Sequence, residues 1–186
     1  FHLLPSRQIY LFDGRAPVRL SKDMKNDSAL LRRTRLEKVS NDEFTMADYA
    51  RCIKLYEQLY LEKYTPLNPQ YTATYLADAH QSDILQLEGL RDPGGTLVAI
   101  GGRFQYGQTM TQPLLGYDTM RPLEEGLYRL STAMAQRDAM ANGLLFNMSA
   151  AQRLVVGIDV GTQGTKAVAE DLDLSLIHIS APTRRR

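Results

Sequence analysis

The stretch that decides the fold runs from Gly94 to Ala150. It opens with GGTLVAIGGRFQYGQTMTQPLLGYD, residues 94–118, which predicts two strands joined by a turn. The mixed run of apolar residues and glycines over 97–102 is typical of a strand covered on both faces. Residues 106–108, Tyr-Gly-Gln, supply a hairpin turn before the second strand, Thr109 to Tyr117.

A helix is predicted next by EEGLYRLSTAMAQRDAMANG, residues 124–143. Its apolar residues recur at helical spacing, and Gly143 is a good stop because glycine adopts the left-handed cap without a Cβ penalty. A third strand, LLFNMS, then starts at Leu144. The stretch is therefore a β-β-α-β unit, in which three residues of the helix are expected to be buried against the sheet: Leu127, Leu130 and Met134.

The composition is that of an ordinary globular chain of 186 residues, 44% hydrophobic and 23% charged, with a net charge of +1. This balance gives no electrostatic sign of a nucleic-acid partner. The partner that we expect is a small-molecule substrate. No apolar run has the length of a membrane span, and the lone Cys52 is expected in the core, so we expect a cytoplasmic location. His80 has no metal-ligand pattern around it, and no metal site is predicted.

Before the central unit the sequence alternates turn and helix signals. Asp13-Gly14 predicts a tight hairpin between strands 7–12 and 15–20, and residues 21–26 are turn-like. Thr45 and Asp48 form a capping box for a helix to about residue 63, whose tyrosines either line a substrate pocket or pack in the core. A basic helix is predicted over 29–39, and its basic residues either form a solvated face or contact a phosphate. A short helix over 71–80 and a strand over 83–90 complete this part.

Five sequence phrases within about residues 3–150 are informative together: PSRQIYLFDGR, LYEQLYLEKYTPLNPQYT, VAIGGRF, LLGYDT and GLYRLSTAMAQRDAMANGLLFNMSA. They resemble the GNAT superfamily of N-acyltransferases, in particular a bacterial branch of it. The resemblance implies an α/β fold of the α+β type, with an incomplete, mixed, largely antiparallel sheet and helices. It also implies acyl transfer from acyl-CoA, or another activated donor, to an amine.

In that superfamily the strands before and after the central helix splay apart, and backbone amides at the helix N-terminus hold the pyrophosphate of acyl-CoA. The matching loop here is DTMRPLEEG, residues 118–126, with one glycine where the superfamily has two. Glu124 and Glu125 suit the helix dipole but oppose a bound pyrophosphate. The alternatives are therefore acyl-CoA, another donor, or a non-catalytic binding module. Three nearby residues are weak catalytic candidates: Tyr117, Asp118 and Tyr128.

After Ala150 the segment 153–173, RLVVGIDVGTQGTKAVAEDLD, predicts a C-terminal β-hairpin with a Gly-rich turn. Its D-x-G-T-x-x-T-K spacing resembles the first hairpin of the FGGY carbohydrate kinases, with Asp159 organising Mg²⁺ and Lys166 adding positive charge at the ATP phosphates. Gly161, Thr162 and Gln163 would offer backbone amides to the phosphates. ATP and Mg²⁺ would bind only in a complete kinase.

The tail, residues 174–186, resembles the translation of a sequencing adapter. The sequence thus predicts three parts: an acyltransferase-like part over 1–150, a kinase-like hairpin over 151–173 and an artefact-like tail. Three functions stay open: an N-acyltransferase fragment that is inactive as it stands, a carbohydrate-kinase fragment, and a GNAT-like binding module.

Overall fold

The computed structural model describes residues 4–17, 20–161, 164–171 and 175–180. The chain divides into two compact units, Leu11–Asn147 and Phe1–Tyr10 with Met148–Arg186. The first of them contains the elements that sequence analysis placed at the centre. All the side-chain contacts that we discuss lie in this unit.

The sheet of the Leu11–Asn147 unit is mixed and largely antiparallel. Strands β2 (Glu37–Val39), β3 (Gln86–Arg91), β4 (Leu97–Tyr106) and β5 (Thr109–Tyr117) are antiparallel neighbours in chain order. The start of β6 (Leu145–Gly161) pairs with β5 in parallel, from Thr109↔Leu145 to Thr111↔Asn147. A parallel pair needs a crossover connection, which α4 (Leu127–Ala141) provides.

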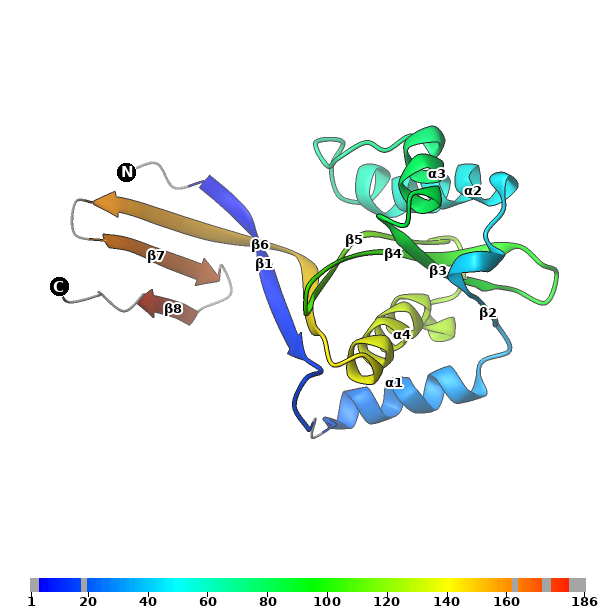
Figure 1. The fold of residues 1–186 in the computed structure, drawn as a ribbon, viewed down its shortest axis with the longest axis horizontal. Coiled ribbons are helices and arrows are strands. Elements are labelled where there is room, and N and C mark those ends of the chain that lie inside the picture. The colour runs from blue at the N-terminus through cyan, green and yellow to red at the C-terminus, as the bar shows by residue number, and fades with distance from the viewer. Residues whose placement is uncertain (1–3, 18–19, 162–163, 172–174, 181–186) are drawn as a thin grey trace. The chain divides into compact units, whose positions relative to one another are not determined.

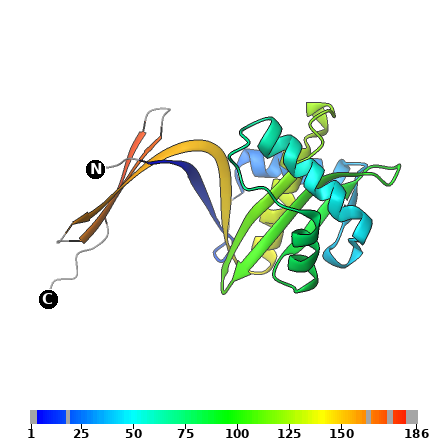
Figure 2. The ribbon, with the colours of Figure 1, turned by 90° about the horizontal axis from the view of Figure 1, so that it is seen from above.

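Helices cover both faces of this sheet (Figure 1). On one face lie α2 (Met46–Glu57), which continues into a π-helical turn, η2 (Gln58–Glu62), and α3 (Ala73–Gln81). Figure 2, seen from the side of α2 and α3, shows these helices lying over the strands. On the other face lie α4 and α1 (Lys22–Arg33), which pack against each other. The predicted α/β fold class is confirmed.

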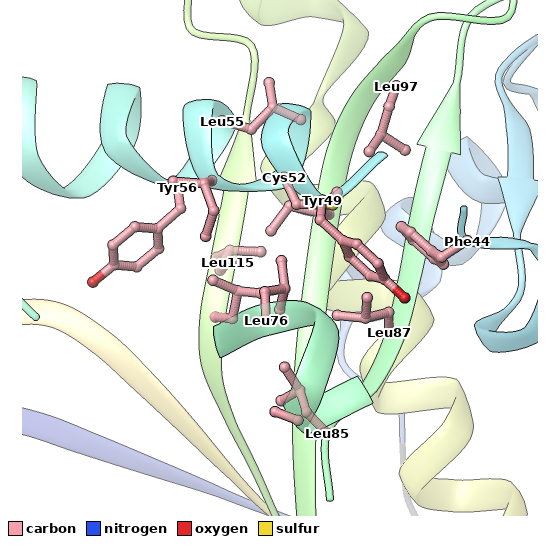
Figure 3. Close-up of a cluster of buried hydrophobic side chains, with 14 of the residues drawn as sticks. Phe44, Tyr49, Cys52, Leu55, Tyr56, Leu76, Leu85, Leu87, Leu97 and Leu115 are labelled. Atoms are coloured by element: carbon pink, nitrogen blue, oxygen red, sulfur yellow. The ribbon is translucent and has the colours of Figure 1, made fainter. Parts of the chain in front are cut away.

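The larger hydrophobic core lies between the sheet and the α2–α3 layer (Figure 3). Cys52, Leu55 and Leu87 are completely buried there, and Tyr56 is 2% exposed. Burial raises the pKa of the Cys52 thiol to about 12, so this cysteine is a core residue rather than a nucleophile, as predicted.

A second core joins α1 and α4 to the opposite face of the sheet. Leu127, Leu130 and Met134 are 5%, 0% and 7% exposed, which confirms the predicted apolar face of the helix. They pack with Leu30 of α1 and with Val98 of β4. The predicted β-β-α-β unit therefore forms, although α4 begins at Leu127 and the third strand begins at Leu145 and continues to Gly161.

The start of α2 is held by the predicted capping box. The Asp48 carboxylate accepts hydrogen bonds from the Thr45 backbone N–H and hydroxyl, both at 2.8 Å, and from Arg91 Nη2 of β3 at 2.8 Å. Burial alone would raise the pKa of Asp48, but these hydrogen bonds outweigh it and hold the pKa below its usual value. The helix N-terminus is thereby tied to the sheet.

The hairpin predicted at Asp13-Gly14 is wrong. Strand β1 (Leu4–Asp13) is present, but no strand follows it in residues 14–17, and Ser21 caps α1 where a turn was predicted. Gly14 does not have the positive φ of a primed turn. Its N–H donates to Leu144 O at 2.9 Å, and a Cβ would lie 2.5 Å from Ala139 O, so this glycine serves a close backbone approach.

The helix predicted over 29–39 is correct only in its first half. Helix α1 starts earlier, at Lys22, and ends at Arg33 because Thr34 leaves the helical conformation. Glu37–Val39 then becomes β2, whose Lys38 pairs with Leu90. Pairing with a neighbouring strand has overridden the local helical pattern.

In the other unit, β1 pairs with β6, and β6 is followed by β7 (Gly164–Asp171) and β8 (Ser175–Ser180). The predicted C-terminal hairpin is confirmed, since β6 and β7 are antiparallel from Leu154↔Asp171 to Gly161↔Gly164. Strand β6 continues without a break across residues 150–153, where sequence analysis placed a junction.

Candidate functional site

The three catalytic candidates lie where β5 ends and α4 begins. Tyr117 is the last residue of β5, and Asp118 opens the connecting loop. The rings of Tyr117 and Tyr128 meet edge to face, with their centroids 6.5 Å apart. Tyr128 is 48% exposed, and Tyr117 is half-buried between the two cores. The structure thus brings all three candidates to one end of the sheet.

Asp118 has a structural role at this position. Its carboxylate accepts a hydrogen bond from Arg51 Nη2 at 2.9 Å and one from the Met120 backbone N–H at 3.1 Å. Its own N–H donates to Val98 O at 2.9 Å. A carboxylate held in this way orients the loop, and the two phenols are left as the candidates that could exchange a proton with a substrate.

The N-terminus of α4 has no side-chain cap. Gly126 is the N-cap in the left-handed conformation, with φ of 67°, and no side chain accepts from the first turn. The N–H groups of Leu127, Tyr128 and Arg129 therefore have no acceptor within the helix. Such a terminus attracts anions through its amides and its dipole.

The acidic residues before α4 are less repulsive to an anion than their sequence suggests. Arg121 binds Glu125 through two nitrogens, Nε at 2.7 Å and Nη2 at 3.1 Å, and Asp92 through Nη1 at 3.0 Å. The charge of Glu125 is therefore paired, whereas Glu124 is exposed. Sequence analysis considered only the helix dipole at these glutamates and did not include the pairing of Glu125 with Arg121, four residues earlier.

A cavity of about 470 Å³ borders this loop. Arg33 and Arg35, from the end of α1 and the segment after it, line the cavity together with Arg121. Both Arg33 and Arg35 are exposed, and neither forms an ion pair with any residue described by the structure. Sequence analysis favoured a solvated face for these arginines. Glu124 and Glu125 line the same cavity, so three guanidinium groups and two carboxylates surround it.

The tyrosine stripe of α2 and η2 packs mainly in the core. The rings of Tyr56 and Tyr60 stack with centroids 4.9 Å apart, and both residues are buried. The Tyr56 hydroxyl donates to Pro69 O at 2.8 Å. A neighbouring pocket lined by Tyr71 and Tyr75 encloses only about 10 Å³. This supports core packing over a substrate pocket for the stripe.

The residues assigned to ATP lie in the β6–β7 hairpin. Asp159 and Lys166 are register partners, and Gly161 pairs with Gly164 at the end of the hairpin. Thr162 and Gln163 are outside the described residues. All the residues assigned to ATP were assigned from the kinase resemblance alone.

The described side chains give no support for His80 as a metal ligand or for a metal site. His80 Nδ1 lies 2.9 Å from the Tyr49 hydroxyl, which gives the ring a partner in the first core. No cluster of three or more His, Cys, Asp or Glu among these side chains is placed to hold a metal ion. In the same described part, no helix has both the length and the apolar character to cross a membrane.

Comparison with known proteins gives structural neighbours only. No protein-family model matches the chain, and no curated protein matches it. One similar structure is the C-terminal domain (DUF2156) of an Agrobacterium fabrum protein described as a lysylphosphatidylglycerol synthetase, with a TM-score of 0.53 and 14% identity. Another is L-PGS from Bacillus licheniformis, with a TM-score of 0.58 and 11% identity.

Each likeness covers 79% of this chain, which spans 48% of the Agrobacterium chain and 46% of the Bacillus one. At these identities the likeness shows the fold alone. The interpretation of the chain as a chimera, with a hairpin from an FGGY kinase and an adapter-like tail joined to an unrelated part, is wrong, since neither structural neighbour is a carbohydrate kinase. The D-x-G-T-x-x-T-K residues here form a Gly-rich hairpin into which β6 runs unbroken.

Proposed function

We propose that the chain is part of an acyltransferase, which moves an acyl group from a phosphate-bearing activated donor to an amine. The observation that carries the proposal is the uncapped N-terminus of α4 beside the cavity of Arg33 and Arg35. Amides with no helical acceptor and unpaired guanidinium groups together suit a phosphate or pyrophosphate. The donor's phosphates would lie there, with its acyl end directed toward β5.

The pairing of β5 with β6 supports a place for the acyl group. The parallel register ends at Thr111↔Asn147, so residues 112–117 of β5 have no β6 partner in the described register. A strand edge that is free of a neighbour offers backbone N–H groups, and a backbone N–H can polarise an acyl carbonyl. Tyr117 and Tyr128 lie at the end of this segment as candidate proton donors to the leaving group.

In this proposal the acceptor nitrogen, after losing a proton, attacks the acyl carbonyl and forms the new C–N bond. The bond from the acyl carbon to the donor then breaks, and the leaving group takes a proton from a phenol. The phenolate recovers a proton from the acceptor nitrogen as the amide forms, and the proton that the acceptor lost first goes to solvent. Acyl-CoA is the first donor to test. The name of the Agrobacterium neighbour, a synthetase for lysylphosphatidylglycerol, also points to an aminoacyl group as the transferred unit.

The double substitution Arg33→Gln/Arg35→Gln should weaken the binding of acetyl-CoA by at least about tenfold, since the loss of even one charge-assisted hydrogen bond removes about 1.5–3 kcal/mol and about 1.4 kcal/mol is tenfold. Isothermal titration calorimetry measures the effect. Arg32→Gln is the matched control, because Arg32 is also exposed but lines a different cavity, with Met24 and Ser28.

An unaltered affinity in the double variant, or an equal loss in Arg32→Gln, would show that the phosphates do not bind in this cavity. Binding of the donor without release of free CoA in the presence of amines would favour the binding-module alternative. Failure of the unsubstituted chain to bind acetyl-CoA would exclude it as the donor.

A further inference from the structure

A second polar cavity lies on the α4 face of the sheet and shares no lining residue with the cavity beside Arg33. It encloses about 310 Å³ between β2, β3, β4 and the last turns of α4. Its walls carry five charged side chains from four elements. These are Lys38 of β2, Glu88 of β3, Arg103 of β4, and Arg137 and Asp138 of α4.

Two of these charged side chains are almost completely buried. The side chain of Glu88 is 12% exposed and that of Arg103 is 11% exposed. Arg103 Nη1 lies 2.6 Å from Asp138 Oδ2 and 4.0 Å from Glu88 Oε2, so the guanidinium is flanked by carboxylates of β3 and α4. Charges are rarely buried unless a partner compensates them.

The hydrogen-bonding capacity of this cluster is not used up. Arg103 Nε, Arg103 Nη1 and Glu88 Oε1 are buried atoms without a hydrogen-bond partner. Nη1 is ion-paired with Asp138, so Nε is the Arg103 donor that has no partner at all. Burial of a polar group without a partner costs free energy. An occupant that accepts from Arg103 would remove this cost.

The charge balance indicates the sign of that occupant. Lys38, Arg103 and Arg137 outnumber Glu88 and Asp138 by one positive charge. Burial raises the pKa of Glu88 to about 7, and Asp138 adds to this effect, while Arg103, Lys38 and Arg137 oppose it. Glu88 can therefore be neutral near pH 7, which leaves the cavity with two excess positive charges.

We propose that this cavity binds a small oxyanion, a carboxylate or a phosphate, with Arg103 as its anchor, and that Glu88 takes up a proton when the anion binds. The guanidinium offers Nε to an oxygen of the anion, and Lys38 and Arg137 add positive charge from β2 and α4. A protonated Glu88 removes the repulsion between its carboxylate and the anion. The site is independent of the proposed acyl-donor cavity.

The test is an NMR titration of the ¹⁵N-labelled chain, following the Arg103 Nε–H signal at constant ionic strength. Acetate represents the carboxylates and sulfate represents the phosphates, and neither probe titrates between pH 6 and pH 8. With a Glu88 pKa of about 7, the protonated fraction falls about tenfold over this range. Binding should therefore be about tenfold weaker at pH 8 than at pH 6. A response to only one probe identifies the class of anion.

Two variants separate the proton switch at Glu88 from the positive charge of Lys38. Glu88→Gln should retain binding and lose its dependence on pH between 6 and 8, because the amide is neutral throughout. Lys38→Gln should weaken binding several-fold through the loss of one charge. Lys54→Gln is the matched control, because Lys54 is exposed on α2, over the opposite face of the sheet.

The absence of a shift of the Arg103 signal with either probe at pH 6 would overturn the proposal and leave a water-filled cavity. A pH dependence that persists in Glu88→Gln would overturn the role of Glu88. An equal loss of affinity in Lys38→Gln and Lys54→Gln would show that the loss comes from the net charge of the chain and not from the position of Lys38 in this cavity. Circular dichroism confirms that each variant has kept its fold.

Discussion

Replacement of Leu130 by Ala should lower the free energy of unfolding by about 2–5 kcal/mol. Leu130 is completely buried between α4 and the sheet, where it packs with Leu30, Val98 and Met134. The substitution removes apolar contacts with these neighbours and leaves a cavity that the surrounding helices and strands can fill only in part. Urea unfolding, followed by circular dichroism, measures the loss as a lower midpoint at an unchanged slope.

The matched control for this substitution is Leu123→Ala. Leu123 stands seven residues earlier in the same β5–α4 segment but is 88% exposed. Its replacement should change the stability by less than about 0.5 kcal/mol. A comparable loss in the two variants would show that α4 does not bury its Leu130 face against the sheet.

The second large effect is expected from Gly116→Ala in β5. A Cβ at this position would lie 2.5 Å from Tyr56 N and 2.6 Å from the carbonyl carbon of Leu55. These are backbone atoms of α2, which cannot rotate away as the end of a flexible side chain can. We expect a loss of about 1–3 kcal/mol, the usual cost of overpacking.

Gly94→Ala serves as the control for Gly116→Ala. Gly94 lies in the turn before β4, and a Cβ there would meet only the Asp92 carboxylate, at 3.3 Å. The free energy of unfolding of Gly94→Ala should stay within about 0.5 kcal/mol of that of the unsubstituted chain. If Gly116→Ala were equally well tolerated, α2 would not approach β5 as closely as described.

The central unit could be predicted from sequence because its signals are local and agree with one another. Gly107 and Gly143 mark a hairpin turn and a helix end, and both have the positive φ that such positions require. The buried face of α4 follows from the spacing of Leu127, Leu130 and Met134. Residues within or next to each of these elements determine its conformation, and the same holds for the capping box of α2.

The N-terminal segment was predicted less well because its structure depends on distant contacts. Asp13-Gly14 is a strong local hairpin signal, yet Gly14 is required by the carbonyls of Ala139 and Leu144, far along the chain. Likewise, Glu37–Val39 becomes a strand because β3 is available as its partner. Tertiary contacts overrode the local pattern at both places.

The candidate sites, too, could be predicted from sequence only where they depend on local patterns. The loop and helix start near Tyr117, Asp118 and Tyr128 follow from the strand and helix pattern. The positions of Arg33 and Arg35 beside them require the packing of α1 on α4, which no local pattern reveals. The cluster of Glu88 and Arg103 likewise depends on the register of β3 and β4, so its buried charges are recognisable only in the folded chain.

The most direct test of the acyltransferase proposal is an amide NMR titration of the chain with acetyl-CoA. We expect the N–H signals of Leu127, Tyr128 and Arg129 to shift with saturation, because the donor's phosphates accept hydrogen bonds from the first turn of α4. Signals of the Glu88–Arg103 cavity should change little. Saturable shifts confined to other parts of the chain, or no shifts at all, would contradict the placement of an acyl-CoA donor at this helix.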